Sequence, residues 1–349
     1  MTCRIDRRSF LSTSVLAGAT AVGIRSAEEK SLMAMLKNPT DPKKLKETTD
    51  PSGMPMGNLG DLKISRLIAG GNILNGWCHN RDLLYVSTLA GQYLTEEKKF
   101  DTLELYEENG INTCSPDPIQ LGFINKYKQD RGGEIQTVVG VHEDWEYFSD
   151  PKWSRLKENI DFSIDQGATT LYIQGGYTEH LMKTGNPKRI EIIGKGIEYI
   201  KQQGFVAGLG GHDTKVIEIA DKYEMDPDYY MKTFHHDRYW SAHPRDQREH
   251  WSVDAQRYVD HNKFHDNMFD LFPEKTIALM EKQKKPWIAF KTLAAGAIRP
   301  SDAFEFCFKN GADFLTVGMF DFQVVEDTLI AKRTLAMDEV TNRSRAWMA

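Results

Sequence analysis

The sequence predicts a single (β/α)₈ barrel over residues 54–349, and three observations support this fold class. Short apolar segments alternate with longer amphipathic segments about every 30–40 residues, which is typical of repeated β–α units. Four expected helices end in a glycine directly before the next apolar segment, at Gly110, Gly167, Gly204 and Gly311. Glycine suits this position because it adopts the left-handed capping conformation at little cost. The chain has 349 residues, 40% of them hydrophobic, which is enough for the core of one such barrel.

Each strand is expected where a short apolar run stands between turn residues, and each helix where apolar residues recur at helical spacing. A short hairpin that includes residues 62–64 comes first. The eight barrel strands are expected at 67–71, 111–114, 135–141, 170–174, 205–209, 230–234, 287–290 and 314–317. The helices are expected at 96–109, 118–130, 151–166, 187–203, 214–224, 266–284, 301–310 and 323–336. An open doubly wound sheet is the alternative, but Gly70-Gly71-Asn72 lacks the G-x-G-x-x-G spacing of its first turn.

The first 27 residues resemble a twin-arginine signal peptide. The motif Arg7-Arg8-Ser9-Phe10-Leu11 precedes a weakly apolar run over 15–24, with alternative cleavage points after Ala21 and Ala27. We therefore expect export through the twin-arginine translocase, to the periplasm or otherwise out of the cytoplasm. Residues 28–53 are polar and read as a linker. No later segment reaches the ~18 consecutive apolar residues of a membrane helix, so no membrane span is expected after cleavage.

Charge and cysteine usage exclude several classes of protein. The formal net charge is −6, and the chain has no long basic block, which argues against nucleic-acid binding through phosphate contacts. Of four cysteines, one lies in the signal peptide and the other three show no CxxC spacing. Neither a disulfide framework nor a zinc finger is therefore predicted, although one disulfide between two of the three stays open.

Candidate catalytic residues stand at the carboxyl ends of the expected strands, which meet at one face of a barrel where active sites are built. Histidines followed by carboxylates occupy three of these ends: His142-Glu143, His212-Asp213 and His235-His236-Asp237. Converging imidazoles and carboxylates can hold a divalent metal or transfer protons. We expect acid–base catalysis from the first pair, His142 and Glu143. The expected ligands of a divalent metal are His212, His235, His236 and Glu143.

Some of these residues have structural alternatives. Strand alternation lets only one of His235 and His236 face the barrel, and the other is then structural. His142 could serve only to cap the loop after its strand. Lys291, at the end of the seventh strand, is expected to be catalytic, by polarising a carbonyl, binding an anion or forming a Schiff base. Alternatively, Lys291 has no catalytic role, and its aliphatic side chain extends the ammonium group into solvent.

Five further residues in the strand-end loops are expected to bind substrate: Asn72, Gln174, Tyr239, Trp240 and Asp321. Tyr239 and Trp240 belong to a long polar and aromatic excursion over 237–264, and loops of this length on a barrel are usually functional. Their flat faces suit stacking on a sugar ring, which favours a carbohydrate as the small-molecule substrate. Asp321 has the alternative role of capping the last helix.

Several stretches of the chain resemble the aldo-keto reductase superfamily. Residues 56–67 (MGNLGDLKISRL) are similar to its opening hairpin, and 293–296 (LAAG), 316–319 (TVGM) and 324–327 (VVED) to its last two strands and final helix. The resemblance covers most of residues 54–340 and implies a (β/α)₈ barrel.

The catalytic tetrad of that family is not retained. Asn112 stands where the family has Asp, and no Tyr follows at the matching spacing. Residues 140–143 contain no Lys, and Gln174 stands in place of the family's His. The basic residues that hold the NADP phosphate after the eighth strand are also missing, so NADP is not expected as a cofactor. A shared fold does not by itself supply the reductase chemistry.

Together these features predict an exported barrel enzyme, a metal-assisted lyase, isomerase or hydrolase that acts on a small polar substrate such as a carbohydrate. One alternative is an NAD(P)-dependent oxidoreductase with a rebuilt proton donor. Another is a barrel without catalytic activity that binds sugar or a partner protein.

Overall fold

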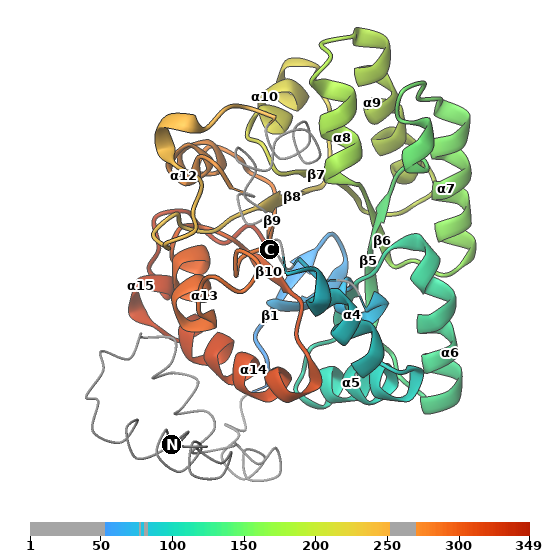
Figure 1. Cartoon of the computed structure of the whole chain (residues 1–349). Coiled ribbons are helices and arrows are strands. Elements are labelled where there is room, and N and C mark those ends of the chain that lie inside the picture. The colour runs from blue at the N-terminus through green and yellow to red at the C-terminus, as the bar shows by residue number, and fades with distance from the viewer. Residues whose placement is uncertain (1–52, 77, 80–82, 252–269) are drawn as a thin grey trace, which may run out of the picture. The chain divides into compact units, whose positions relative to one another are not determined.

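The computed structural model describes residues 53–76, 78–79, 83–251 and 270–349. The expected signal peptide (1–27), nearly all of the linker (28–53) and the last part of the excursion (237–264) lie outside these residues. Within them, eight parallel strands form a closed barrel, and the helices surround it (Figure 1). The predicted (β/α)₈ class is therefore confirmed.

The strands follow one another around the barrel in chain order, and the barrel closes where the last strand pairs with the first. They are β3 (Leu67–Gly70), β4 (Thr113–Ser115), β5 (Gln136–Val141), β6 (Thr170–Ile173), β7 (Ala207–Gly211), β8 (Tyr229–Thr233), β9 (Trp287–Phe290) and β10 (Phe314–Val317). β4 and β7 begin two residues later than expected. For β7 the reason is its sequence, AGLGG, which lacks β-branched residues, so the apolar pattern points to the preceding residues instead.

The helices are α4 (Leu84–Tyr93), α5 (Glu96–Glu108), α6 (Leu121–Arg131), α7 (Trp153–Asp165), α8 (Gly175–Met182), α9 (Pro187–Gln202), α10 (Lys215–Lys222), α12 (Pro273–Met280), α13 (Pro300–Lys309), α14 (Asp321–Leu335) and α15 (Asp338–Thr341). The sequence pattern did not predict α8, because Gly175 and Gly176 are typical of a loop. Gln174 begins this helix as its N-cap, where its side-chain Oε1 accepts a hydrogen bond from the Tyr177 N–H at 2.8 Å.

The predicted hairpin, formed by β1 (Met56–Leu59) and β2 (Leu62–Ser65), covers the amino-terminal end of the barrel. Its residues contact the starts of the strands: Ser65 N–H donates to Asn112 Oδ1 at 2.9 Å, and Gln136 Nε2 donates to the Lys63 carbonyl at 2.9 Å. Asn112 therefore lies at the end of the barrel opposite to the face where catalysis is expected.

A buried ionic cluster attaches residues 343–348 to the same end. Asp313, directly before β10, lies 2.9 Å from Arg343 Nη2 and 2.7 Å from Arg345 Nη1, and all three side chains are buried. The guanidinium of Arg343 also stacks on Trp347, 3.5 Å from the ring centroid.

The interior of the barrel is apolar in the half next to the hairpin, towards the amino-terminal ends of the strands. Ile68, Val138, Tyr229, Ile288 and Phe314 pack there in one cluster with two side chains of the hairpin. A second, larger cluster fills the space between the strands and the helices. Each such aliphatic or aromatic side chain contributes roughly 1.5–3 kcal/mol through burial. Polar inward-facing residues are therefore concentrated at the carboxyl ends of the strands.

No helix in the described part of the chain is long and apolar enough to cross a membrane. The three described cysteines, Cys78, Cys114 and Cys307, form no disulfide with one another.

Candidate active site

Strand alternation determines which side chains face the barrel interior at the carboxyl ends. Val138, Tyr229 and Phe314 belong to the interior cluster, so residues two or four positions further along the same strands face the same way. The inward residues at this end, the barrel mouth, are Ser115, His142, Tyr172, Gln174, His212, Thr233, Phe290 and Thr316. The structure therefore brings His142, His212 and Gln174 to one face.

A carboxylate holds the ring of His212. Nδ1 of His212 lies 3.1 Å from Glu179 Oε2, and Glu179 Oε1 accepts the Asp213 N–H at 2.7 Å. The Glu179 side chain is almost completely buried, whereas that of His212 is 11% exposed. Because the carboxylate accepts a hydrogen bond, the proton of the neutral imidazole lies on Nδ1 and Nε2 is its basic atom. This arrangement is the one that orients catalytic histidines.

The second imidazole of the mouth, His142, lies near Asp117. Its Nδ1 contacts the carbonyl oxygen of Glu143, which again makes Nε2 the basic atom. Burial raises the pKa of Asp117, and the neighbouring His142 acts in the opposite direction. Asn75 Nδ2 donates a hydrogen bond of 3.3 Å to Asp117 Oδ2. Asp117 and His142 therefore form a second pair of titratable groups at the mouth.

Tyr172 lies between the two histidines, because β6 pairs with β5 on one side and with β7 on the other. Its ring crosses the backbone of Gly140, where a Cβ atom would lie only 2.8 Å from the Tyr172 hydroxyl. Burial raises the pKa of Tyr172 well above its usual value. The phenol therefore stays protonated at neutral pH and can donate a hydrogen bond to a substrate.

Lys291 adds a cationic group on the side of His212. Its Nζ contacts His79 Nε2, and the ring of the preceding Phe290 lies 5.2 Å from the His212 ring. Lys291 has a φ angle of 55°, and Ala294 and Ala295 in the same loop have φ angles of 46° and 55°. Non-glycine residues rarely adopt this left-handed conformation, and they do so most often at functional sites.

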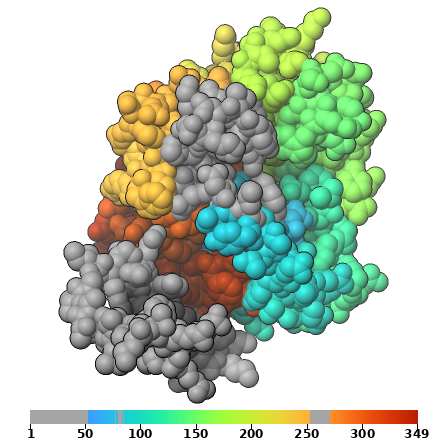
Figure 2. Space-filling model, in the orientation of Figure 1, coloured from blue at the N-terminus to red at the C-terminus, as the bar shows by residue number. Residues whose placement is uncertain are grey.

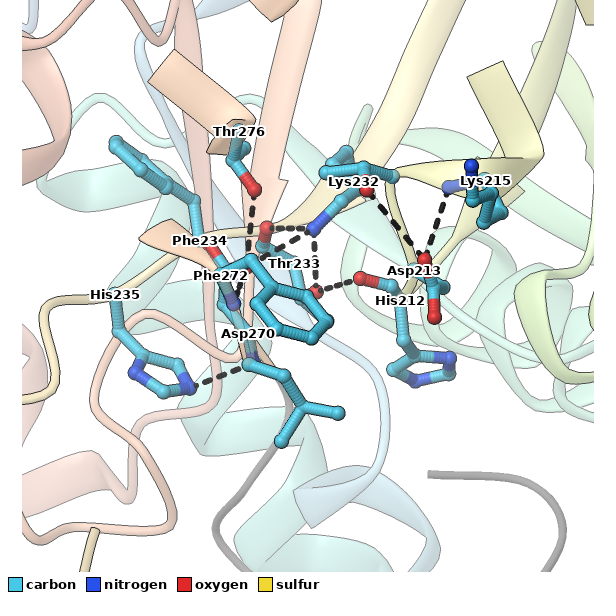
Figure 3. A network of polar contacts seen from close by, with 12 residues as sticks. His212, Asp213, Lys215, Lys232, Thr233, Phe234, His235, Asp270, Phe272 and Thr276 are labelled. Carbon is cyan, nitrogen blue, oxygen red and sulfur yellow. Dashed lines mark hydrogen bonds and ion pairs between the residues drawn. The ribbon is translucent and has the colours of Figure 1, made fainter. Parts of the chain in front are cut away.

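A polar network behind the mouth fixes the backbone of His212 (Figure 3). Thr233 Oγ1 donates to the His212 carbonyl at 3.0 Å, and Lys232 Nζ donates to the Thr233 carbonyl at 2.8 Å. Lys232 Nζ also lies 3.5 Å from Asp270 Oδ1, and both side chains are buried. Burial raises the pKa of Asp270, and Lys232 opposes this shift. Lys232 lies between inward-facing neighbours on β8 and therefore points away from the mouth.

Glu143, expected as a catalytic residue and metal ligand, points away from the mouth. Its carboxylate accepts hydrogen bonds from the Tyr177 hydroxyl at 2.7 Å, from the Lys152 N–H at 2.7 Å and from Arg155 Nε at 2.8 Å. Alternation explains this placement, since Glu143 follows the inward-facing His142.

His235 and His236 use ring nitrogens in hydrogen bonds with the backbone. His235 is buried; its Nδ1 bonds to the His236 carbonyl at 2.9 Å, and its Nε2 accepts the Asp270 N–H at 3.0 Å. Burial lowers the pKa of His235 to about 4. His236 Nδ1 accepts the Arg238 N–H at 3.1 Å. Among the described residues, no three His, Cys, Asp or Glu side chains form a group that could hold a metal.

The expected substrate-binding residues are dispersed. Asn72 is half-buried at the end of the first barrel strand, and Gln174 caps α8. The Tyr239 ring lies 5.8 Å from that of His235, whereas Trp240 is 82% exposed. Asp321 accepts a hydrogen bond from the Tyr93 hydroxyl at 2.7 Å and pairs with Lys98 at 3.0 Å. Asp321 therefore joins α14 to the segment after β3.

A cavity of about 10 Å³ lies beside the His212–Glu179 pair. It is lined by Glu179, His212, Asp213, Thr214, Trp251, Asp270, Leu271 and Phe272. A space of this size accommodates about one water molecule.

The sequence prediction missed Glu179, Tyr172 and Asp117. Tyr172 could have been found, because it stands two residues before Gln174 on the same strand face. The sequence places Asp117 in the loop after the second strand, but only the folded structure shows that it lies beside His142. No sequence pattern pointed to Glu179, because the helix that carries it, α8, was not predicted.

Comparisons with known proteins identify the fold and no family. No model of a protein family matches the chain, and no curated protein matches it. Among solved structures, a putative aldo-keto reductase from Pseudomonas aeruginosa has a TM-score of 0.54 at 15% identity, over 83% of this chain and 99% of that one. The apo form of Gox0644 has a TM-score of 0.52 at 10% identity, over 85% and 94%. These likenesses confirm the barrel fold that the resemblance to aldo-keto reductases implied.

Proposed function

We propose that this protein is an enzyme that moves protons on a small polar substrate at the barrel mouth, as an isomerase or a lyase does. The contact between His212 Nδ1 and Glu179 at 3.1 Å carries the proposal. A buried carboxylate fixes the tautomer of the imidazole and stabilises the imidazolium that forms when the ring accepts a proton. In this reaction, His212 removes a proton through Nε2. His142, across Tyr172, donates a proton to the substrate from Nε2 of its imidazolium form and becomes the neutral ring with its proton on Nδ1.

Tyr172 and Lys291 would stabilise the negative charge that develops. When a proton leaves a carbon next to a carbonyl group, charge accumulates on the carbonyl oxygen, and preorganised donors lower the barrier. The phenol of Tyr172 is protonated at neutral pH, as an ordinary tyrosine is, and the raised pKa keeps it a donor at higher pH as well. Lys291 would supply an ammonium group from the strained loop after β9.

A bound divalent metal is a separate proposal. The described residues form no group of three metal ligands. The proposed proton transfers by His142 and His212 do not require a metal. Plasma mass spectrometry of protein purified without chelators tests for a metal. About one equivalent of a transition metal would require ligands beyond the described residues.

Export is also a proposal, and it rests on Arg7-Arg8-Ser9-Phe10-Leu11. Replacement of both arginines by lysine is expected to keep the protein in the cytoplasm, and cell fractionation measures this.

Proton exchange with solvent tests the enzymatic proposal. The protein is incubated in D₂O with a panel of aldoses, ketoses, uronic acids and hydroxy acids, and NMR follows replacement of C–H by C–D. We expect exchange with the wild type, a loss of about 100-fold or more in H212Q and H142Q, and no change in F162A, whose side chain is exposed on α7.

Two results would contradict the proposal. NADPH consumption with a carbonyl compound, without exchange, would indicate an oxidoreductase. Ligand binding without exchange or reduction would indicate a binding protein.

A further inference from the structure

Exposed apolar side chains are concentrated on the face that carries the candidate active site. Among the residues that the structure describes, ten large apolar side chains are exposed. Nine of them follow the carboxyl ends of strands: Leu83, Tyr85, Leu89, Tyr93, Ile119, Trp145, Tyr147, Trp240 and Phe322. The tenth, Phe162, lies on α7. Neighbouring exposed apolar side chains can mark a binding site, so the groups of rings that contact one another on this face are the candidates.

One aromatic group lies where the segments after β3 and β10 meet. The rings of Phe320 and Phe322 are parallel, with centroids 5.4 Å apart and an interplanar angle of 5°. Tyr93 packs edge-on against Phe320 at 5.9 Å and against Phe322 at 6.3 Å. Figure 2 shows the cyan segment after β3 on the same face as the orange-red C-terminal segments. These rings form a packed aromatic cluster at the rim of the mouth, in which Tyr93 and Phe322 are exposed.

Trp145 is the exposed aromatic residue that adjoins the proposed acid–base group. Its ring centroid lies 5.4 Å from that of His142 and 4.5 Å from that of Phe148. The indole also rests on Gly176, where a Cβ atom would lie only 3.1 Å from Cη2. With 59% of the residue still exposed, Trp145 offers a fixed aromatic surface directly beside His142.

The chemistry of this rim fits sugar rings. A pyranose has an apolar face of C–H groups, which packs on an aromatic ring, and a rim of hydroxyl groups, which donate hydrogen bonds. Asp144 and Glu146, both exposed, flank Trp145 in the sequence and can accept hydrogen bonds from such hydroxyls. The same carboxylates and the net charge of −6 disfavour an anionic membrane surface, which attracts basic segments.

We propose that the rim of the mouth binds a neutral oligosaccharide, with Trp145 stacked on the sugar ring next to the one that reaches His142. The inference rests on the proposed function for the role of the mouth, and it names the substrate class. Tyr93 follows β3, and Phe320 and Phe322 follow β10, whereas Trp145 follows β5. Because β4 lies between β3 and β5 in the barrel, this separation implies a ligand longer than one ring.

Binding of oligosaccharides of increasing length tests the inference. The probes are cello-, xylo-, malto- and manno-oligosaccharides from the monosaccharide to the hexasaccharide, followed by saturation-transfer NMR and titration. We expect affinity to rise with length for at least one series. W145A should lower the affinity for the longest member about ten-fold, W145F should lower it less, and F162A, the exposed aromatic residue on α7, should leave it unchanged.

Three outcomes would overturn the inference: no series shows length-dependent binding, W145A binds as tightly as the wild type, or W145A abolishes a dimer seen for the wild type by sedimentation velocity. The last outcome would assign the rim to a protein contact. H212Q separates the two proposals, because it is expected to lose proton exchange and keep oligosaccharide binding. Trp145-dependent binding without exchange would refute only the proposed function.

Discussion

Glu179 on α8 and His212 at the end of β7 are 33 residues apart in sequence, and their side chains meet at 3.1 Å. The barrel order explains the contact, because α8 follows β6 and β6 pairs with β7. The same carboxylate also accepts the Asp213 N–H, so its position is fixed by the backbone of the loop that carries His212. The ring of His212 is thus oriented by the fold before any substrate binds.

Replacement of Glu179 by Gln is expected to disturb the tautomer of His212. An amide can present N–H groups to Nδ1, which would shift the imidazole proton to Nε2 and remove the basic atom from the mouth. We expect ¹⁵N NMR of histidine-labelled protein to show this shift, and proton exchange to fall about 10- to 100-fold. An unchanged tautomer in E179Q would contradict the assigned role, whereas H142Q should leave the His212 signals in place.

Replacement of Glu143 by Gln is expected to reduce stability more than it affects chemistry. The carboxylate is buried and accepts three hydrogen bonds, one of them from Arg155. An amide keeps only one acceptor oxygen, so one of the donors around the buried Glu143 position would face an N–H group, at a cost of about 1–3 kcal/mol. Chemical denaturation of E143Q measures this cost. Full stability together with lost proton exchange would restore Glu143 as a catalytic candidate.

Glu143 shows how far the sequence could predict the site. The sequence placed His142 and Glu143 directly after a strand, where the structure has them. Alternation applied to that pair would have sent one of the two residues outward, and a catalytic role for either stays a prediction. The sequence could not show that α8 forms after Gln174, because its first turn contains two glycines. Without α8, neither the Tyr177 hydroxyl that bonds to Glu143 nor Glu179, the partner of His212, could be predicted.

Asp327 on α14 is expected to make stability depend on pH. Burial, with a smaller contribution from Glu326, raises the pKa of this carboxyl group to about 7 from an ordinary 3.8. The folded state therefore binds the proton more tightly than the unfolded state. The resulting stabilisation is complete below about pH 4 and is lost as the pH rises to about 7. D327N should be more stable than the wild type at pH 8, by roughly 2–4 kcal/mol, and no more stable at pH 4.

Asp226 provides a control of opposite sign. Lys201 and Lys285 lower the pKa of this exposed carboxyl group to about 2. Its stabilisation is present above about pH 4 and is lost as the pH falls towards 2. D226N should therefore cause a small loss of stability at neutral pH. Thermal unfolding across this pH range measures both variants, and parallel curves for D327N and the wild type would exclude the role of Asp327.

Replacement of Asp313 by Asn is expected to be strongly destabilising. Arg343 and Arg345 are both buried against this carboxylate, and two guanidinium groups would remain without a counter-charge. Breaking a buried pair in this way costs about 3–5 kcal/mol. D130N, which breaks the exposed Lys126–Asp130 pair, should cost far less, because solvent screens that pair. Urea denaturation compares the two variants, and equal costs would contradict the structural role of the cluster.

The bounds of the apolar barrel strands were easier to predict than the polar contacts at the mouth, for a physical reason. Strands such as β9 and β10 bury continuous apolar runs, and their bounds agree with the prediction at both ends. The polar side chains at the mouth are specified by contacts between loops far apart in sequence, such as Lys291 with His79. No local pattern carries information of that kind.

Because β3 pairs with β10, the barrel cannot close during translation until the last strand has been synthesised. Arg66 beside β3 bonds to the carbonyl of Asp313, 247 residues later in the chain. At roughly 5–20 residues per second, a ribosome needs about 12–50 s to make the intervening segment. Throughout that interval the free edge of β3 has no partner on the β10 side, and unpaired edges promote aggregation. The nascent chain is therefore expected to depend on chaperones for longer than a protein whose first strand pairs locally.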